Sequence, residues 1–451
     1  MSQITMKDLV NYAKTYGFIY QGSEIYGGLA NTWDYGILGA RLKNNLKDMW
    51  RKFFIQLRDN AYEIDASILM HPKVWEASGH IKNFSDPLLD CKECKMRVRA
   101  DKLIEEFDSN IIADKMTDKE MEEFIKDNKI PCPNCGASDF TSIREFNLMF
   151  ETTRGVTKDS KSTIYLRPEN AQGEYVNFLN VLRTARTKLP FSIGQIGKAF
   201  RNEITPGNFT FRTIEFEQME YQTFCKKDTD EKQYEFFKEY GMKFMEYIGL
   251  AREKLRYKDH EKLAHYAKNA CDIEYLFPFG WGEINGTHNR TDFDLKNHQE
   301  LSKISMEYLD EETGEKYIPY IVESTYGVDR ILLALLFDAY NEEEDRVVLK
   351  LNEKIAPIKA SVLPLMKKYH GEKSEEIYNI FKQHFMTSIE DSGSIGKRYK
   401  RNDAIGIPYS ITIDDETLKN NTVTVRFRDD ASQKTMTIEE AIKYIEEKTR
   451  I

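Results

Sequence analysis

FRNEITPGNFTFRTIEFEQMEY, residues 200–221, contains two short runs in which polar residues occupy alternate positions. Between these runs lies TPGN, residues 205–208, whose Pro, Gly and Asn favour a turn. We therefore expect an antiparallel hairpin with a long tip. Because side chains alternate along a strand, Arg201 and Glu203 would share one face of the first strand. On the same argument, Arg212, Phe216 and Glu220 would share one face of the second strand.

This charged face has two interpretations. The first is a solvated hairpin with scattered charges, which the same pattern would produce. The second is a nucleotide platform, in which the arginines bind phosphate oxygens, Phe216 stacks on a base and Glu203 accepts an exocyclic amine. The hairpin alone does not separate them, so partners elsewhere in the chain are needed.

The composition describes a chain of 451 residues with a formal net charge of -9, 41% hydrophobic and 31% charged residues. This length allows two or three domains. No apolar run approaches the about 20 residues of a membrane span, and the first residues lack the pattern of a secretory signal. The six cysteines are not spaced as a disulfide framework, so we expect a cytoplasmic protein. A nucleic-acid partner would need a local basic patch, because the net negative charge of the chain repels nucleic acid.

Two Cys-x-x-Cys pairs, Cys91 with Cys94 and Cys132 with Cys135, match the four thiolates of a tetrahedral zinc site. The alternatives are reduced thiols without a metal, or a redox pair. Zinc is favoured because Cys-Pro-x-Cys-Gly makes the tight turn that such a site needs, and four thiolates indicate a structural metal. The long acidic spacer, residues 100–128, predicts a helical insertion. Cys225 and Cys271 are interpreted as core residues.

The other elements expected in the first 350 residues follow from local patterns. We expect helices over residues 2–18, 41–57 and 228–268, and loops over 21–39 and 279–295, with Glu283 and Arg290 exposed in the latter. Residues 331–340 are nearly all apolar and predict a buried helix. Arg330 at its first turn opposes the helix dipole, which an anionic ligand nearby would explain.

Two further side chains leave alternatives open. Arg99 is either a surface charge or a clamp for a carboxylate. Glu169 lies between Pro168 and the Gly173 turn, with Gln172 one turn later, and is either a simple helix-start acid or a receptor for an ammonium group.

From residue 355 onward the chain alternates strands and helices, which predicts a compact α/β domain with a mixed sheet. Strands are expected over 358–364, 405–413 and 422–428, and helices over 374–386 and 437–449. Lys397, Arg398, Lys400 and Arg401 form a basic run that is either a solvated face or an RNA-binding patch.

Three segments resemble the motifs of class II aminoacyl-tRNA synthetases. Arg201-Asn202-Glu203, with Arg212 and Phe216 beyond the loop, resembles motif 2. Gly327-Val328-Asp329-Arg330 resembles motif 3, and the helix over 41–57 has the position of motif 1, although the usual proline of motif 1 is not evident. From residue 19 to the C-terminus the chain resembles the bacterial-type, homodimeric glycyl-tRNA synthetases of class IIa. The most specific stretches lie at 27–39, 78–91, 167–178, 200–220, 289–295 and 391–409.

The resemblance implies an α+β fold. It implies a class II catalytic domain over residues 1–350, built on an antiparallel sheet flanked by helices. A zinc-ribbon-like insertion would occupy about 88–145 and a helical insertion about 226–270. An α/β anticodon-binding domain would occupy 355–451.

The resemblance also implies a reaction and its partners. The enzyme would ligate glycine to tRNA(Gly) with ATP and Mg²⁺, through a glycyl-adenylate, releasing AMP and pyrophosphate. It would be a cytoplasmic homodimer without a membrane partner, and would carry a structural Zn²⁺ held by the four cysteines. The alternatives are another class IIa ligase, for threonine, proline or histidine, or a non-catalytic synthetase-like subunit that binds nucleic acid.

By the same likeness, each site residue receives a role. Arg201 would bind the α-phosphate, Glu203 the adenine amine, and Arg212 and Arg330 the γ-phosphate, while Phe216 would stack on adenine and Glu283 would serve the phosphates with Mg²⁺. Arg201, Glu283 and Arg330 would be catalytic. The implied ATP site also includes Asn202, Phe211, Thr213, Ile214, Glu215, Ile284, Gly327, Val328 and Asp329. The implied glycine site comprises Arg99, Glu169, Phe216, Glu217, Gln218, Met219, Glu220, Arg290, Glu323, Ser324, Thr325, Tyr326 and Gly327. The family usually has Pro-Ser after the residue equivalent to Glu323, so Ser324-Thr325 keeps a hydroxyl at the second position but puts the depth of the pocket in question.

Overall fold

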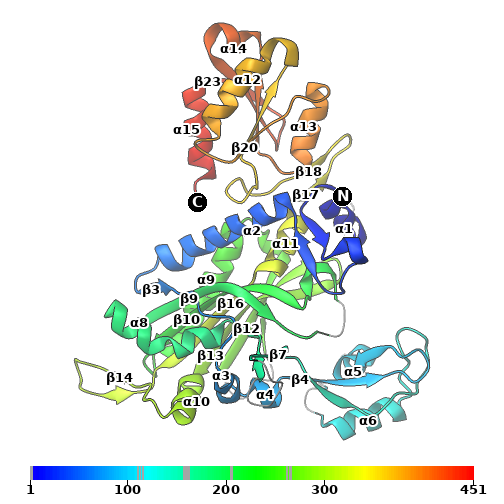
Figure 1. Ribbon diagram of the computed structural model, residues 1–451, viewed down its shortest axis with the longest axis vertical. Coiled ribbons are helices and arrows are strands. Elements are labelled where there is room, and N and C mark those ends of the chain that lie inside the picture. The colour runs from blue at the N-terminus through cyan, green and yellow to red at the C-terminus, as the bar shows by residue number, and fades with distance from the viewer. Residues whose placement is uncertain are drawn as a thin grey trace.

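The computed structural model describes residues 4–108, 111, 113, 116–155, 163–203, 207–260, 263 and 267–451. Among these residues the largest sheet has seven strands, in the order β11-β12-β13-β16-β10-β9-β3. All neighbours pair antiparallel except β3 with β9. The strands are β3 (Ala61–Glu63), β9 (Phe191–Phe200), β10 (Glu215–Cys225), β11 (Leu255–Asp259), β12 (Asn269–Phe277), β13 (Gly280–Thr291) and β16 (Tyr320–Gly327). The expected antiparallel sheet flanked by helices is therefore present (Figure 1).

The two faces of this sheet differ in what covers them. One face packs on α2 (Ile37–Trp50), α9 (Asp230–Tyr247) and α11 (Val328–Ala339), and forms the main apolar core. The other face packs on α7 (Ala171–Val176), α8 (Phe178–Ala185) and α10 (Phe293–Ser302) around a smaller core. β16 shows the alternation, since Val322 and Tyr326 enter the main core while Ile321 enters the smaller one.

The expected helix over 41–57 begins earlier and changes type. α2 starts at Ile37 and continues after Trp50 as a π-helix over Arg51–Gln56. Its apolar stripe is buried in this chain as far as Phe54, but Leu57 is 61% exposed. The wider turn of a π-helix changes the spacing of side chains, which takes Leu57 out of the stripe. α1 (Met6–Thr15) lies within the helix expected at 2–18, whereas 21–39 also contains β2 (Trp33–Tyr35), which pairs with β1 (Ile19–Gln21).

The loop expected over 279–295 was wrong, because most of it is β13, a central strand of the sheet. Gly282 in this strand serves close packing, because a Cβ there would lie 2.7 Å from the ring of Phe211. The amide of Asn285 donates to the backbone oxygen of Thr325 on the neighbouring strand at 2.9 Å. Arg290, expected to be exposed, is only 5% exposed, whereas Glu283 is exposed as expected.

The helix expected over 228–268 was correct only in its first part. α9 ends at Tyr247, and β11 then pairs with β12 at the edge of the sheet. Pairing with the next strand, β12, overrode the charged, helix-like composition of this segment. Residues 261, 262 and 264–266 of the expected insertion lie outside the described residues.

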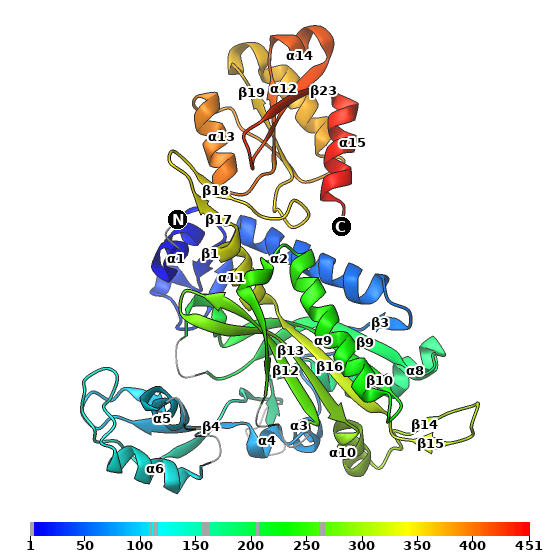
Figure 2. The ribbon, with the colours of Figure 1, turned by 180° about the vertical axis from the view of Figure 1, so that it is seen from behind.

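The segment that contains the Cys-x-x-Cys pairs forms a small body beside the main sheet (Figures 1 and 2). Its sheet has the order β5-β4-β6. The elements are β4 (Ser85–Asp90), β5 (Arg97–Arg99), α5 (Ala100–Phe107), α6 (Asp118–Asp127) and β6 (Arg144–Asn147). They enclose a core of their own that includes Leu89, Ile104 and Ile125. The helical spacer expected over 100–128 corresponds to α5 and α6, with 109, 110, 112, 114 and 115 outside the described residues.

The C-terminal part has a mixed sheet in the order β20-β19-β21-β22-β23, as the alternating pattern predicts. β19 pairs parallel with β20 and β21, and the remaining pairs are antiparallel. The elements are β19 (Ala360–Pro364), α12 (Lys367–Phe381), β20 (Thr387–Ile389), α13 (Ile395–Ala404), β21 (Tyr409–Ile413), α14 (Asp415–Asn420), β22 (Thr422–Phe427), β23 (Gln433–Thr437) and α15 (Ile438–Thr449). Its core is separate from that of the main sheet.

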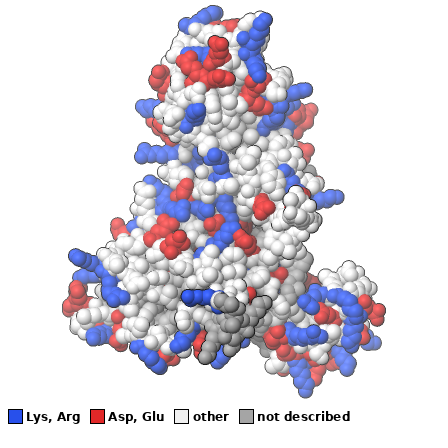
Figure 3. Space-filling view, viewed as in Figure 1, with Lys and Arg blue, Asp and Glu red and all other residues white. Residues whose placement is uncertain are grey.

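In the basic run at 397–401, Lys397, Lys400 and Arg401 are exposed, whereas Arg398 is not. Arg398 is 2% exposed, and its guanidinium donates to the backbone oxygens of Pro364 and Glu390. Lys400 pairs with Asp345 at 3.0 Å, and Arg401 pairs with Glu390. Figure 3 shows basic and acidic side chains interspersed over this part of the face in view. Among the described residues, no helix is long and apolar enough to span a bilayer.

Candidate active site

The residues expected to bind a nucleotide line one cleft in the main sheet, where β10 begins and β16 ends. The cleft has an enclosed volume of about 110 Å³ and opens to solvent. It is lined by Arg201, Glu203, Thr210, Phe211, Arg212, Thr213, Phe216, Glu217, Gln218, Glu283, Ile284, Thr325, Gly327, Asp329 and Arg330. Segments more than 100 residues apart in the sequence therefore meet at one site.

The hairpin exists, but its charged residues are arranged differently from the expectation. β9 ends at Phe200 and β10 begins at Glu215, so Arg201, Glu203 and Arg212 lie in the connection and not on strand faces. The ends of the connection are held by the Arg201 amide, which donates to the Ile214 oxygen, and by a bridge between Gly207 and Arg212. Residues 204–206, which include part of the expected turn, lie outside the described residues. Phe216 and Glu220 do alternate onto one face of β10.

The guanidinium of Arg201 lies between two aromatic rings. Its central carbon is 5.2 Å from the centre of the Phe216 ring and 5.3 Å from that of Phe84, and its Nε donates to the Pro168 oxygen at 3.2 Å. Cation–π contact of this kind fixes the position of a charge without neutralising it. The cation therefore remains available to an anionic ligand in the cleft.

Arg330 enters the cleft from the first turn of α11. Its guanidinium lies over the Phe211 ring at 4.4 Å and donates to the Phe211 oxygen at 3.0 Å. It also donates to the Glu283 carboxylate at 3.0 Å. The Glu283 side chain is about half exposed in the cleft, and its carboxylate oxygens are the type of ligand that Mg²⁺ prefers.

A buried ion-pair network fixes the junction of β10 and α11. The ammonium of Lys43 lies 3.0 Å from both Glu217 and Asp329, and Asp329 also accepts the Glu217 amide at 2.7 Å. Lys43 on α2 was missed at the sequence level, because a single lysine beside an apolar helix stripe has no local signal of its partners. This network holds the segment from which Phe216 and Arg330 project.

The remaining residues of the implied ATP site support the cleft from outside. Ile214 and Asn202 make backbone hydrogen bonds to Asn31 and Leu148, and Glu215 is exposed and pairs with Lys198. Val328 is buried in the main core. Their side chains do not line the cleft.

Beside the cleft lies a cluster of buried acids, here called the acidic chamber, and Thr325 in the cleft lining contacts it. The Thr325 hydroxyl donates to the Glu220 carboxyl at 2.8 Å. The Gln222 amide donates to Glu220 at 3.0 Å and to Glu323 at 3.2 Å. Arg290 lies 3.1 Å from Glu323 and is held by a bidentate pair with Asp294. Glu220, Glu323, Arg290 and Thr325, predicted as glycine ligands, are thus brought together.

Neighbouring charges set different ionisation states for the acids of this chamber. Burial opposes ionisation of Glu323, but Arg290 and His288 outweigh it and lower its pKa to about 2. Glu169 also has a lowered pKa, because His80 and Arg290 outweigh burial. Burial and the charge of Glu323 raise the pKa of Glu220 well above its usual value. The chamber therefore combines ionised carboxylates with one that retains its proton more strongly.

Glu174 is a further acid of the chamber that the sequence did not single out. It is 0% exposed on α7, and neither carboxyl oxygen has a hydrogen-bond partner among the described residues. Burial and the charges of Glu220 and Glu323 raise its pKa well above the usual value. His80 and His288 were missed as well. They pair with Glu169 and Glu323, which are distant in the sequence, so no local pattern indicates these contacts.

The remaining residues of the implied glycine site divide between the two faces of the sheet. Gln218 and Gly327 line the cleft, whereas Met219 and Tyr326 enter the main core, and the Ser324 hydroxyl bonds Tyr326 at 2.8 Å. Arg99 is a carboxylate clamp for this chain's own acids, since it lies 2.9 Å from Asp86 and 2.6 Å from Asp101.

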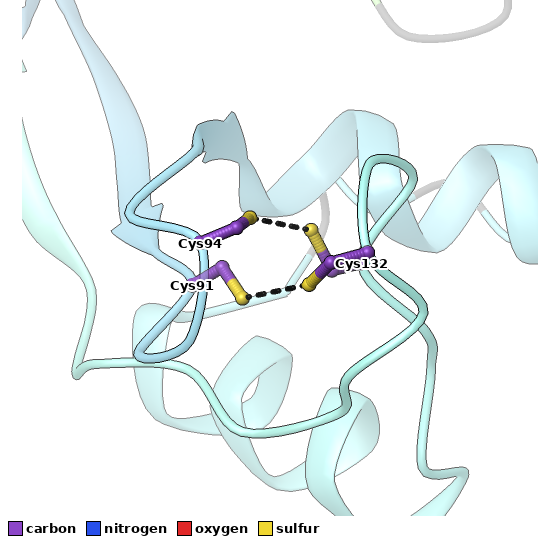
Figure 4. A group of neighbouring side chains, drawn as sticks. Cys91, Cys94 and Cys132 are labelled. Carbon is purple, nitrogen blue, oxygen red and sulfur yellow. Dashed lines mark hydrogen bonds between the residues drawn. The ribbon is translucent and has the colours of Figure 1, made fainter.

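The four cysteines of the Cys-x-x-Cys pairs converge (Figure 4). Cys91 and Cys135 have their sulfurs 3.6 Å apart, Cys94 and Cys132 have theirs 3.7 Å apart, and all four lie within 4.8 Å of one another. A tetrahedron of thiolates around Zn²⁺ has sulfurs about 3.8 Å apart, from a Zn–S bond of about 2.3 Å. A disulfide needs about 2.05 Å. The donor set and spacing fit zinc. Cys225 and Cys271 are buried in the main core, as predicted.

Comparisons with known proteins agree with this geometry. Residues 150–339 match a family model described as the tRNA synthetase class II core domain (G, H, P, S and T), and residues 355–448 match one described as an anticodon binding domain. A curated protein of Clostridium acetobutylicum named glycine–tRNA ligase is 54% identical over 99% of both chains. Proteins of the same name from Clostridium tetani and Alkaliphilus oremlandii are 54% and 53% identical, over 98% and 99% of both chains.

Proposed function

The chain belongs to the glycine–tRNA ligase family of class II synthetases, and on this premise we propose that it ligates glycine to tRNA(Gly) with ATP. The observation that carries the proposal is the common cleft of Arg201, Phe216, Glu283 and Arg330, together with the hydrogen bond from Thr325 in its lining to the buried acid Glu220. An anion site with an aromatic plate suits a nucleotide, and buried carboxylates suit an ammonium group.

In this proposal the first reaction joins glycine to AMP. An oxygen of the glycine carboxylate attacks the α-phosphorus, the bond to the bridging oxygen breaks, and pyrophosphate leaves. Arg201 stabilises the charge that develops on the α-phosphate, while Arg330 and Arg212 bind the γ-phosphate. Glu283 is the residue that would hold Mg²⁺, which when bound neutralises phosphate charge. The chain's contribution is positioning and electrostatic stabilisation, and no side chain needs to form a covalent bond.

In the second reaction the terminal hydroxyl of the tRNA attacks the carbonyl carbon of glycyl-adenylate, and AMP leaves. The C-terminal part that matches the anticodon-binding model would contact the tRNA away from the cleft. The basic run at 397–401 supports this contact only in part, since Arg398 is buried and Lys400 and Arg401 pair with acids, whereas Lys397 is exposed.

Selection of glycine follows from the crowded chamber. Its acids attract the ammonium group, and the Gln222 amide that links Glu220 and Glu323 leaves these carboxyls little freedom to move apart. An extra methyl group would have to push packed atoms aside, at a cost of about 1–3 kcal/mol. The larger amino acids are excluded by the same means, so no separate editing site is required.

A homodimer is part of the proposal. The apolar stripe of α2 is consumed by this chain's own core, so it offers no partner surface. Another set of apolar side chains is exposed nearby: Ile25 is 89% exposed, Tyr26 87% and Ile37 77%. We propose that these side chains take part in an interface with a second copy. Light scattering after gel filtration measures the mass directly. We further propose a cytoplasmic location and a structural Zn²⁺ at the four cysteines.

The decisive experiment is pyrophosphate exchange into ATP with each amino acid in turn. Exchange that depends on glycine supports the proposal, and equal exchange with alanine or threonine overturns it. ATP binding by calorimetry separates a ligase from a non-catalytic subunit, because Arg201→Ala should lose it. Lys198→Ala is the matched control, since Lys198 is an exposed cation near the end of β9, just before Arg201, and lies outside the cleft.

A further inference from the structure

A second cluster of metal-binding side chain types lies on the outer strands of the main sheet. His260 follows β11, Asp272 is on β12 and His288 is on β13. The backbone fixes their order, since the His260 amide donates to the Ala270 oxygen and Ala270 is the register partner of His288. Asp272 is the register partner of Gly286. The three side chains therefore come from neighbouring strands that hydrogen bonds hold in place.

The potential ligand atoms of this cluster are close together. One atom from each of His260, Asp272 and His288 lies within 4.8 Å of the other two. His260 Nε2 is 2.8 Å from Asp272 Oδ2, and the two imidazole rings are 6.1 Å apart. A tetrahedral metal ion with bonds of about 2.0–2.2 Å to nitrogen and oxygen needs ligand atoms about 3.3–3.6 Å apart, which lies between the 2.8 Å of this pair and the 4.8 Å limit of the cluster.

Glu323 orients one of these imidazoles from behind. His288 Nδ1 lies 2.8 Å from Glu323 Oε2, and this carboxylate is 5% exposed. With the Nδ1 proton donated to Glu323, Nε2 of the same ring carries the free lone pair. A histidine that gives its other ring N–H to a carboxylate is the usual arrangement around protein-bound metals.

Gly286 lets the side chains of His288 and Asp272 lie close to the backbone of β13. A Cβ at this position would lie 3.0 Å from His288 Cε1, 3.4 Å from His288 Nε2 and 3.5 Å from Asp272 Oδ1. His288 Nε2 and Asp272 Oδ1 thus approach the same point above Gly286, where a side chain would crowd both of them. This observation is independent of the distances among the three ligands.

We propose that His260, Asp272 and His288 bind a divalent transition-metal ion, with Zn²⁺ as the best match. Two imidazoles and one carboxylate suit zinc and its first-row neighbours, whereas Mg²⁺ and Ca²⁺ prefer all-oxygen sites. Three protein ligands leave a further coordination position open, unlike the closed set of the four cysteines. Through His288 the ion would also hold Glu323 in position and so affect glycine binding. This effect on glycine rests on the proposed function of Glu323, whereas metal binding itself does not.

Calorimetry and metal analysis of the full chain test the site, with the four-cysteine cluster already loaded with zinc. After gel filtration with added zinc, wild type should retain one equivalent more than His260→Ala. His260 is half-exposed, so this variant should fold. Glu323→Gln keeps the three ligands but weakens the orienting hydrogen bond, and should reduce zinc affinity by about 10–100-fold. His384→Ala, which removes an exposed histidine paired with Glu446, is the matched control and should not change zinc binding.

Equal zinc content and affinity in wild type and His260→Ala would overturn the site and leave His260 and Asp272 as a simple ion pair. Unchanged affinity in Glu323→Gln would contradict the orienting role of Glu323. Both results are independent of the ligase proposal, because neither measurement uses glycine, ATP or tRNA. The dependence of the glycine KM on zinc, lost in His260→Ala, measures the consequence for Glu323 separately.

Discussion

Arg201 covers the Phe216 ring, with 5.2 Å between the guanidinium carbon and the ring centre. The phosphate-binding cation and the base-stacking ring proposed for ATP are therefore in direct contact. Phe84 lies on Arg201 at a similar distance, 5.3 Å, and comes from the segment before the cysteine insertion. Because both rings contact Arg201 at similar distances, substituting each ring in turn separates the role of Phe216 from that of Phe84.

If Phe216 stacks on adenine, Phe216→Leu should raise the KM for ATP by about tenfold, since an aromatic contact contributes about 0.5–1.5 kcal/mol beyond its buried area. Phe84→Leu removes the other ring from Arg201 and should change this KM much less. Steady-state pyrophosphate exchange measures both. Equal effects of the two variants would show that Phe216 acts only by positioning Arg201.

The hydrogen bond from Thr325 to Glu220 should contribute to glycine binding. Thr325→Val keeps the shape but removes the donor, and should raise the KM for glycine by about tenfold because a buried acceptor loses its partner. Thr325→Ser retains the hydroxyl and serves as the control, with a KM near that of wild type. A Thr325→Val enzyme with an unchanged KM would remove Thr325 from the glycine site.

Glu174 should make stability depend on pH in an unusual direction. In acid below about pH 4 both folded and unfolded chains hold its proton, so its raised pKa costs nothing. As the pH rises, the unfolded chain releases this proton while the folded chain retains it, and stability falls. Glu174→Gln lacks this effect, so its gain over wild type should be larger at pH 8 than at pH 4.

Urea unfolding at the two pH values measures the Glu174 effect. The gain at pH 8 should be about 1–3 kcal/mol, the usual cost of an unpaired buried polar group. Glu312→Gln is the control, because the side chain of Glu312 is 81% exposed. A gain for Glu174→Gln that is the same at both pH values would rule out a raised pKa as its cause.

The four cysteines should hold zinc as a unit. Cys132→Ser should lose the zinc of this site and loosen α5 and α6, because the insertion has only a small core of its own. Metal analysis and hydrogen exchange of residues 100–128 measure these two effects. Cys225→Ser changes a buried cysteine outside the cluster and should keep the zinc. Zinc content that is unchanged in Cys132→Ser would discard the site.

Local patterns were sufficient for much of the fold. We predicted correctly the mixed sheet of the C-terminal part, the convergence of the four cysteines and the buried helix beside Arg330. Each depends on side chains within a few residues of one another, or on a spacing that only one chemistry suits. The resemblance of residues 200–221 and 327–330 to synthetase motifs then grouped side chains that composition alone would have left as scattered charges.

The errors have a common physical origin in contacts between distant segments. Residues 279–295 look like a loop because they contain Gly and Asn, yet Gly282 is small to admit the Phe211 ring from the neighbouring hairpin. Arg398 looks like a surface cation, yet two backbone oxygens from other segments allow it to be buried. Neither partner is near in sequence, so no local pattern signals it.

The amino-acid sequence by itself determined the chemical inventory of this protein: arginines and an aromatic ring for a nucleotide, carboxylates for an ammonium group, and four thiolates for a metal. Tertiary structure alone decided which acids are ionised, since Glu323 lies beside Arg290 whereas Glu174 has no cation as a hydrogen-bond partner among the described residues. The reason is that ionisation depends on desolvation and on charges a few ångströms away, and both are set by strand pairing and not by neighbours in the chain.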